Sequence, residues 1–310
     1  MASMQSLTRP SHRTTFLLTV LLVVVGVAVA TTSVLWRLRS EALSRQFALA
    51  ALTAQALEDH LTQSLNVVER TLLLAASTEP ESHRLQTFLQ QAPYLRSLAV
   101  LGADGRIVAS SNPANLGVPV AVDVFMPQST GPLEVLRTGA LSHGRDFADM
   151  ARHGKGALAG VSFIPVSLDV ALSPDRWRTV LATLNTDYFL NFYGNHITPQ
   201  QGVVELLRYD GSRLLSTAPE AVAGSPGHSR LLLSRLAQTD ADSYRELQRN
   251  GTAKLVAYRA SRVYPFVLTV LLDEGQALAA WRREAARTAL VVGLALALLL
   301  GLATLYFLRF

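Results

Sequence analysis

Two uncharged apolar runs constrain the fold of this chain more than any other feature. One covers residues 16–36 and the other residues 288–307. A helix that crosses the hydrocarbon core of a bilayer needs about 20 apolar residues. We therefore predict transmembrane helices at 16–36 and 287–308. We expect short cytoplasmic ends at 1–15 and 309–310, and a single region, residues 37–286, between the two spans.

The first run also allows a second interpretation. Ala28-Val29-Ala30 resembles a signal-peptidase site, and Arg9 and Arg13 precede the run. The apolar core of a cleaved signal peptide is about 7–15 residues long. Here the apolar sequence continues to Trp36, which favours an uncleaved anchor, with cleavage as the alternative.

The distribution of charged residues does not decide on which side of the membrane residues 37–286 lie. Six arginines flank the central region, at 37, 39, 45, 282, 283 and 287, so a simple positive-inside count would place that region in the cytoplasm. Long loops cross the membrane largely regardless of their charge, however. Acidic and basic residues nearly balance within 37–286, so we expect no nucleic-acid partner.

The segment after the first span has the pattern of a long helix. Apolar residues recur there every three or four positions, which marks one face of a helix. They are Leu43, Phe47, Ala50, Ala54, Leu57, Leu61, Leu65, Val68 and Leu72. We predict a stalk helix over 37–78. Its stripe would pack on its own domain, pair with a second copy of the chain, or do both.

A hairpin pattern then occurs twice, 106 residues apart. Residues 97–113 turn at Asp104-Gly105, and residues 203–219 turn at Asp210-Gly211. Asp-Gly between short apolar runs is a strong hairpin signal. Two more apolar strands follow each hairpin, at 157–168 and 178–184 in the first copy and at 253–260 and 265–272 in the second. The sequence predicts a duplicated antiparallel α+β module.

This order of elements resembles the double Cache (PDC-type) extracytoplasmic sensors of bacterial receptors. The strings LGADGRIVASSNPANLG at 101–117, HGRDF at 143–147 and LNTDYF at 184–189 fit that family. The resemblance implies two tandem PAS-like modules, a membrane-distal one at 79–195 and a membrane-proximal one at 196–286. It also implies a periplasmic sensor in the bacterial inner membrane, a small-molecule ligand and a homodimer.

Receptors of this family normally continue into a cytoplasmic effector, whereas only residues 308–310 follow the second apolar run. The sequence therefore leaves two interpretations open. The chain is the sensor part of a longer receptor, or it is a complete protein that acts through a partner.

The resemblance places the ligand in the first module, between the sheet and the loops that cover it. The candidate lining residues are Phe125, Arg145, Asp146, Phe147, Ser162, Pro165, Asn185 and Tyr188. Arg145 would clamp a carboxylate and Asp146 would neutralise an ammonium. The alternatives are a solvated turn or a mutual pair for these two residues, and a helix cap for Asn185. Amino-acid-binding members carry aspartate where Asn185 stands, so the resemblance does not imply an amino acid.

Catalytic signatures do not stand out in this sequence. It contains no Gly-x-Ser-x-Gly elbow, phosphate-binding glycine loop or dinucleotide fingerprint. His143 and His153 flank two aspartates, but the glycine and basic residues beside them (Gly144, Arg145 and Gly154) favour a mobile loop over a metal site. We therefore expect a sensor with no cofactor, no metal and no enzymatic activity. An accessory envelope protein without a small ligand is the alternative, and an extracytoplasmic hydrolase is the least favoured.

Overall fold

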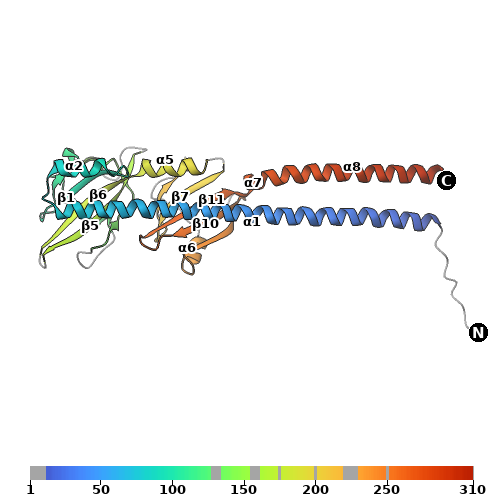
Figure 1. Cartoon of the computed structure of the whole chain (residues 1–310), viewed down its shortest axis with the longest axis horizontal. Helices are drawn as coiled ribbons and strands as arrows, with labels where there is room; N and C mark the ends of the chain where they lie inside the picture. The colour runs from blue at the N-terminus through green and yellow to red at the C-terminus, as the bar shows by residue number, and fades with distance from the viewer. Residues whose placement is uncertain are drawn as a thin grey trace, which may run out of the picture. The chain divides into compact units, whose positions relative to one another are not determined.

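The computed structural model describes seven stretches of the chain: residues 12–126, 134–153, 161–173, 176–198, 201–218, 230–248 and 251–309. The chain divides into two compact units. One, the helical unit, combines Met1–Gln46 with Glu274–Phe310; the other, the sheet unit, is Phe47–Asp273 (Figure 1).

The helical unit contains the start of α1 (His12–Ser77), the short α7 (Glu274–Ala277) and α8 (Ala279–Arg309). Both long helices have a stretch that is long and apolar enough to cross a membrane, and neither stretch is buried within the protein. Leu22 and Leu298, for example, are about two thirds or more exposed. So much exposed apolar surface suits lipid rather than water.

The return to the second apolar helix is interrupted. Helices α7 and α8 are separated at Leu278, which is buried.

The first module of the sheet unit is built on an antiparallel sheet with the strand order β2-β1-β6-β5-β3, and β4 also pairs with β5. Its strands are β1 (Leu95–Leu101), β2 (Ile107–Ser110), β3 (Arg137–Thr138), β4 (Ser142–His143), β5 (Ser162–Ser173) and β6 (Arg176–Asn185). Helices α2 (Ser82–Gln90), α3 (Val122–Phe125), α4 (Phe147–His153) and α5 (Thr186–His196) accompany it, with a short 3₁₀ turn at Pro113–Asn115.

The second module repeats this arrangement, with the strand order β8-β7-β11-β10-β9. Its elements are β7 (Gly202–Arg208), β8 (Arg213–Ser216), α6 (Arg230–Leu236), β9 (Ala241–Leu247), β10 (Ala253–Ala260) and β11 (Phe266–Asp273). The two hairpins have the same register. Ala99 pairs with Ser110 in the first and Glu205 with Ser216 in the second, each 106 residues further on.

The hairpin turns repeat in detail as well. Gly105 has φ +73° and Gly211 has φ +83°, a backbone conformation that side chains with a Cβ rarely adopt. A register irregularity follows at the same place in both copies, after Val100 and after Leu206. The predicted duplication of an antiparallel α+β module is therefore confirmed.

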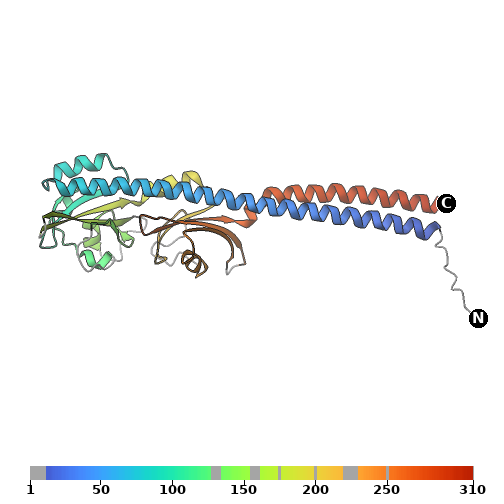
Figure 2. The ribbon, with the colours of Figure 1, turned by 60° about the horizontal axis from the view of Figure 1, so that its bottom comes forward.

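The apolar stripe of α1 is buried against the two modules. Leu57, Leu61, Leu65, Val68 and Leu72 are at most 1% exposed. Figures 1 and 2 show α1 running past both sheets of the sheet unit. The interpretation that this stripe packs on its own domain is confirmed, while pairing with a second copy stays a prediction.

Polar contacts also tie α1 to each module. The hydroxyl of Tyr264, on the turn before β11, donates to Asn66 Oδ1 at 2.8 Å. Arg178 of β6 donates to the carbonyl oxygens of Ala76 and Thr78 at the end of the helix. The helix is thereby joined to the second module at Asn66 and to the first module at its carboxyl end.

Some elements were not predicted from the sequence. Strand β9 was missed because it is an exposed edge strand in which only Tyr244 is buried, so it lacks an apolar run. Strand β5 begins at Ser162 and extends to Ser173, whereas we expected a strand at 157–168; residues 157–160 lie outside the described stretches.

Candidate functional site

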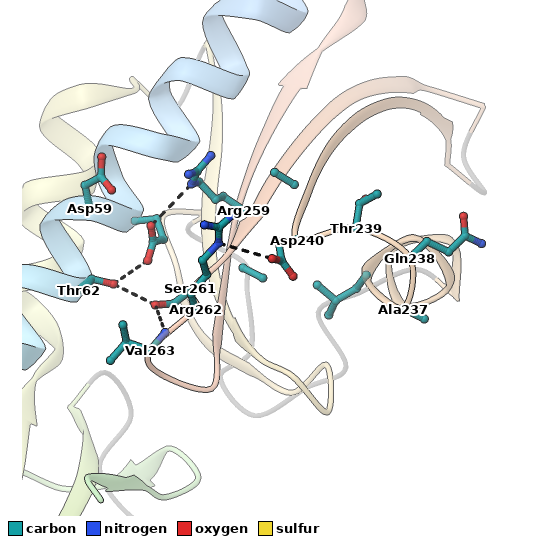
Figure 3. A pocket seen from close by; sticks show the side chains of 14 residues that line it. Asp59, Thr62, Ala237, Gln238, Thr239, Asp240, Arg259, Ser261, Arg262 and Val263 are labelled. Carbon is teal, nitrogen blue, oxygen red and sulfur yellow. Dashed lines mark hydrogen bonds and ion pairs between the residues drawn. The ribbon is translucent and has the colours of Figure 1, made fainter.

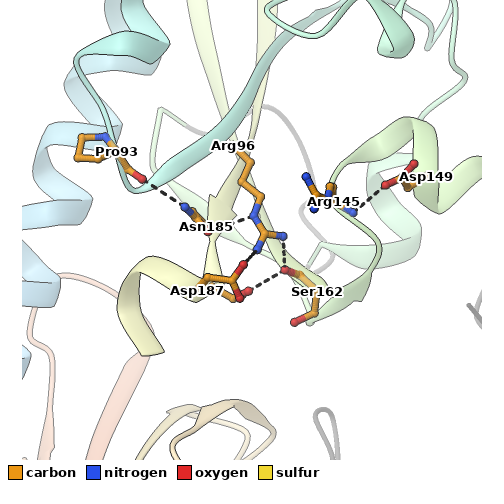
Figure 4. Close-up of polar contacts among 8 residues, drawn as sticks. Pro93, Arg96, Arg145, Asp149, Ser162, Asn185 and Asp187 are labelled. Atoms are coloured by element: carbon orange, nitrogen blue, oxygen red, sulfur yellow. Dashed lines mark hydrogen bonds and ion pairs between the residues drawn. The ribbon is translucent and has the colours of Figure 1, made fainter. Parts of the chain in front are cut away.

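Polar side chains converge at two places in the sheet unit. One is a cleft in the second module, beside α1 (Figure 3). The other is a corner of the first sheet, where β4, β5 and the end of β6 meet (Figure 4). Most of the predicted ligand residues lie at or near this corner.

The strand pairing explains why these residues meet. Ser162 of β5 pairs with His143 of β4, and Phe163 pairs with Asn185 at the end of β6. The segment after His143 carries Arg145, Asp146 and Phe147 into the first turn of α4. The structure therefore brings together three segments that the sequence analysis combined only through the family resemblance.

Arg96 connects the segments of this corner, although it was not among the residues predicted from the sequence. Its Nε donates to Asn185 Oδ1 at 3.0 Å, and its Nη1 donates to the carbonyl oxygen of Ser162 at 2.7 Å. Its Nη2 pairs with the carboxylate of Asp187. A single arginine at the start of an apolar strand was the available signal, but its partners lie about 90 residues away.

Asn185 occupies the N-cap position of α5, as the alternative prediction held, but its side chain makes no capping hydrogen bond. The side-chain oxygen accepts from Arg96 instead, and Nδ2 donates to the carbonyl oxygen of Pro93 at 3.4 Å. Because both the oxygen and the nitrogen of its amide are hydrogen-bonded, Asn185 links the start of α5 to Arg96 in β1 and to Pro93 just before β1.

Asp146 is buried and acts as the N-terminal cap of α4. Its Oδ1 accepts from the backbone N–H groups of Ala148 at 3.1 Å and Asp149 at 3.4 Å. Its other oxygen accepts from the amide of Asn112. A carboxylate with these partners has a structural role, and this geometry favours that interpretation over an ammonium contact.

Arg145 lies beside this cap with an exposed side chain. Its backbone N–H donates to Asp149 Oδ2 at 3.0 Å. The described residues offer its guanidinium no ion pair, so the mutual pair with Asp146 does not form. Of the predicted residues, Arg145 keeps the most freedom to bind an anion.

The predicted aromatic wall is part of the core. Phe147 and Phe163 are fully buried and meet edge to face, with ring centroids 5.6 Å apart. They belong to a cluster of apolar side chains that also contains Ala99, Ile107, Val120 and Leu181. Pro165 is likewise buried in β5. These side chains fill the space over the sheet where the resemblance placed a ligand. Phe125 ends α3, and its side chain lies outside the described residues.

Tyr188 points elsewhere, towards α1. Its hydroxyl lies 3.4 Å from His60 Nε2, and the His60 ring stacks on Phe192 with centroids 3.6 Å apart. Burial lowers the pKa of His60 below its usual value, and the nearby His196 lowers it further. Burial and the contacts with α5 therefore favour the neutral form of the His60 imidazole.

Metal ligands do not cluster in the described stretches. No three side chains of the histidine, aspartate or glutamate type converge there in a way that could hold an ion. His143 is exposed at the end of β4, and the carboxylates of Asp146 and Asp149 accept backbone N–H groups around the start of α4.

No family model matches this sequence, and no curated protein does either. The fold does match solved sensor domains. The extracellular domain of a protein assigned as a histidine kinase, rpHK1S-Z16, is similar with a TM-score of 0.57 and 21% identity, over 77% of this chain and 99% of that one. The corresponding domain of mmHK1S-Z2 has a TM-score of 0.53 and 11% identity, over 76% and 99%.

A third similar structure is an extracellular ligand binding receptor from Desulfohalobium retbaense. Its TM-score is 0.51 at 11% identity, over 72% of this chain and 40% of that one. The chain thus has the fold of extracellular sensor domains, with two Cache modules, a long N-terminal helix and two candidate membrane helices. The expected fold class is confirmed.

Proposed function

We propose that this protein is a transmembrane signal receptor. Its double Cache region would bind a small ligand and pass the resulting change through its membrane helices to an effector. The observation that carries this proposal is the continuity of α1. One helix contains the first apolar segment and then hydrogen-bonds to both modules of the sensor fold.

The contacts of α1 suggest how a signal would travel. A ligand shifts a conformational equilibrium only if it binds one state more tightly than the other. Small sliding motions of packed helices are a known form of such a change. The bonds of Tyr264 to α1 in the second module and of Arg178 in the first are among those that a shift of α1 would alter.

We further propose the boundaries and location that the resemblance implies. Residues 37–286 would face the periplasm, with spans at 16–36 and 287–308 in the inner membrane, and the protein would be a homodimer. Part of α1 suits a second copy, because Leu49, Leu52 and Leu74 are more than half exposed outside the buried stripe.

The first module is our proposed ligand site. Arg145 would bind an anionic group of the ligand, since its guanidinium is exposed at the edge of the corner that Arg96 holds together. Four of the other predicted residues, Phe147, Ser162, Pro165 and Asn185, would support this edge rather than touch the ligand. No enzymatic role is proposed.

Thermal unfolding of the full chain in lipid nanodiscs, against a library of carboxylates, amines, amino acids and purines, tests this function. A ligand at a hundredfold excess over its Kd stabilises the protein by about 2.7 kcal/mol. We expect at least one compound to raise the Tm, with loss of that shift in Arg145→Ala and retention in Arg152→Ala. If no compound shifts the Tm of a folded chain, the sensor proposal is wrong.

One observation favours a second candidate, an accessory membrane protein without a small ligand. Phe147 and Phe163 fill the region above the first sheet, and the carboxylate of Asp146 is committed to a cap. Under this alternative, mild-detergent purification would recover a stoichiometric membrane partner, and the library would have no effect on the Tm.

A further inference from the structure

A cleft of about 630 Å³ lies in the second module, where three segments meet (Figure 3). Helix α1 forms one wall with Glu58, Asp59 and Thr62. The end of β10 and the turn that follows it, residues 259–263, form the second wall, and the connection from α6 to β9, residues 236–241, forms the third. Small-molecule sites are commonly about 300–1,000 Å³ in volume. The cleft is large enough for a small metabolite.

Charged side chains of both signs line this cleft. Glu58 and Asp59 stand on the α1 wall and Asp240 on the connection from α6 to β9, while Arg259 lies at the end of β10 and Arg262 in the turn that follows. A purely anionic ligand would add to the excess of carboxylates, and a purely cationic one would meet two guanidinium groups. A ligand with one group of each sign satisfies both sets of charges.

The two guanidinium groups are held only loosely. Arg259 Nε lies 3.7 Å from Glu58 Oε2, and Arg262 Nε lies 3.6 Å from Asp240 Oδ2. Both distances are too long for a hydrogen bond. Within the part of the chain that the structure describes, the terminal nitrogens of both arginines have no other partner. They are free to receive a carboxylate or phosphate, which guanidinium binds through two parallel hydrogen bonds.

The α1 wall supplies the complementary charge and a link to the turn. The exposed carboxylate of Asp59 has no ion pair with any described residue. Next to it, Glu58 Oε1 accepts from the hydroxyl of Thr62 at 2.6 Å, and the same hydroxyl lies 2.9 Å from Ser261 Oγ. A molecule in the cleft would therefore touch both the stalk helix and the β10–β11 turn.

We propose that this cleft binds a small zwitterion, with its anionic group on Arg262 and Arg259 and its cationic group on Asp59. The inference rests on the proposed sensor function and adds a second site to it, distinct from the corner of the first module. Its occupant bridges α1 and the second sheet, so binding there would bias the position of the helix directly.

Three probes that have four carbons each and carry different charged end groups test the charge requirement. They are succinate, 4-aminobutyrate and 1,4-diaminobutane, each isotope-labelled and measured by equilibrium dialysis against the full chain in phosphatidylcholine nanodiscs. We expect 4-aminobutyrate to bind at least about tenfold more tightly than either of the others, since a charged hydrogen-bonded contact changes affinity by about that factor. Absence of binding by 4-aminobutyrate, or equal binding of all three, overturns the proposal.

Two variants locate the binding. Arg262→Gln and Asp59→Asn alter exposed side chains, so neither leaves a buried charge unpaired. Each should raise the Kd of 4-aminobutyrate about tenfold or more, while Arg176→Gln and Asp123→Asn, at exposed sites in the first module, should leave it unchanged. Binding that survives both cleft variants but is lost in Arg145→Ala overturns the cleft and keeps the sensor function.

Discussion

The hydroxyl of Tyr264 donates to Asn66 Oδ1 at 2.8 Å and so joins the β10–β11 turn to the stalk helix. Tyr264 is buried, and the carboxylate of Glu69 lies 3.0 Å from the same oxygen. Burial raises the pKa of the Tyr264 phenol well above its usual value, and the bond to Glu69 raises it further. The phenol therefore stays protonated and remains a donor to α1 throughout the physiological pH range.

Removing this hydroxyl should weaken the docking of α1. We expect Tyr264→Phe to lower the free energy of unfolding by about 1–2 kcal/mol, because two acceptors lose their donor while the ring stays packed. Tyr94→Phe is the matched control, since its hydroxyl makes no hydrogen bond among the described residues. Equal unfolding curves for the two variants in chemical denaturation would contradict this role.

The corner around Arg96 should depend strongly on its guanidinium. Arg96→Gln is expected to cost about 2–3 kcal/mol, because it removes the partner of Asn185, of the Ser162 carbonyl group and of Asp187 together. Arg176→Gln, at an exposed position of β6, should change stability by less than about 0.5 kcal/mol. Urea unfolding of the purified variants measures both changes in the free energy of unfolding. A loss in Arg96→Gln as small as that in Arg176→Gln would show that the contacts of Arg96 do not stabilise the fold.

His60 should make stability fall on acidification. Its folded-state pKa is below the ordinary value of 6.5, so the unfolded chain takes up a proton first. The contribution of His60 is present above pH 6.5 and is lost as the pH falls from there to the folded-state pKa. His60→Asn should flatten this part of the curve of Tm against pH, whereas substitution of the exposed His83 should leave it in place.

Features that depend on residues close together in the sequence could be predicted, whereas contacts between residues far apart in the sequence could not. The Asp-Gly turns at 104–105 and 210–211 are set by neighbouring residues, so the sequence predicted both hairpins and their repeat. The α1 stripe is likewise a short-range pattern. Partners of polar side chains are different. Arg96 meets Asn185 only because β1 and β6 are adjacent strands, and Asp146 meets Asn112 only after α4 docks.

The candidate site shows the same limit. The family resemblance selected residues near one another in the fold, but it did not distinguish a ligand contact from a cap or a core position. Asp146 and Phe147 are adjacent in the chain, yet one caps α4 and the other packs on Phe163. The cleft of the second module escaped notice because α1 contributes one of its walls, about 180 residues before the others.

The exposed face of α1 offers a direct test of the proposed homodimer. The chain has no cysteine, so a single introduced thiol reports one position. Leu52 is 65% exposed, whereas Ala54 is 1% exposed on the buried stripe. If two copies pair along this face, Leu52→Cys should form a disulfide-linked dimer in membranes under mild oxidation, because paired helices bring equivalent positions close together.

Ala54→Cys is the matched control for that experiment, since its thiol would face the protein's own core and should remain unlinked on non-reducing gels. Linkage at both positions would indicate collisions between partly unfolded chains. Linkage at neither, in a chain that still shows the ligand-induced rise in Tm, would mean that the sensor works as a monomer or pairs through another surface. The route of the signal would then depend on α1 moving against its own modules.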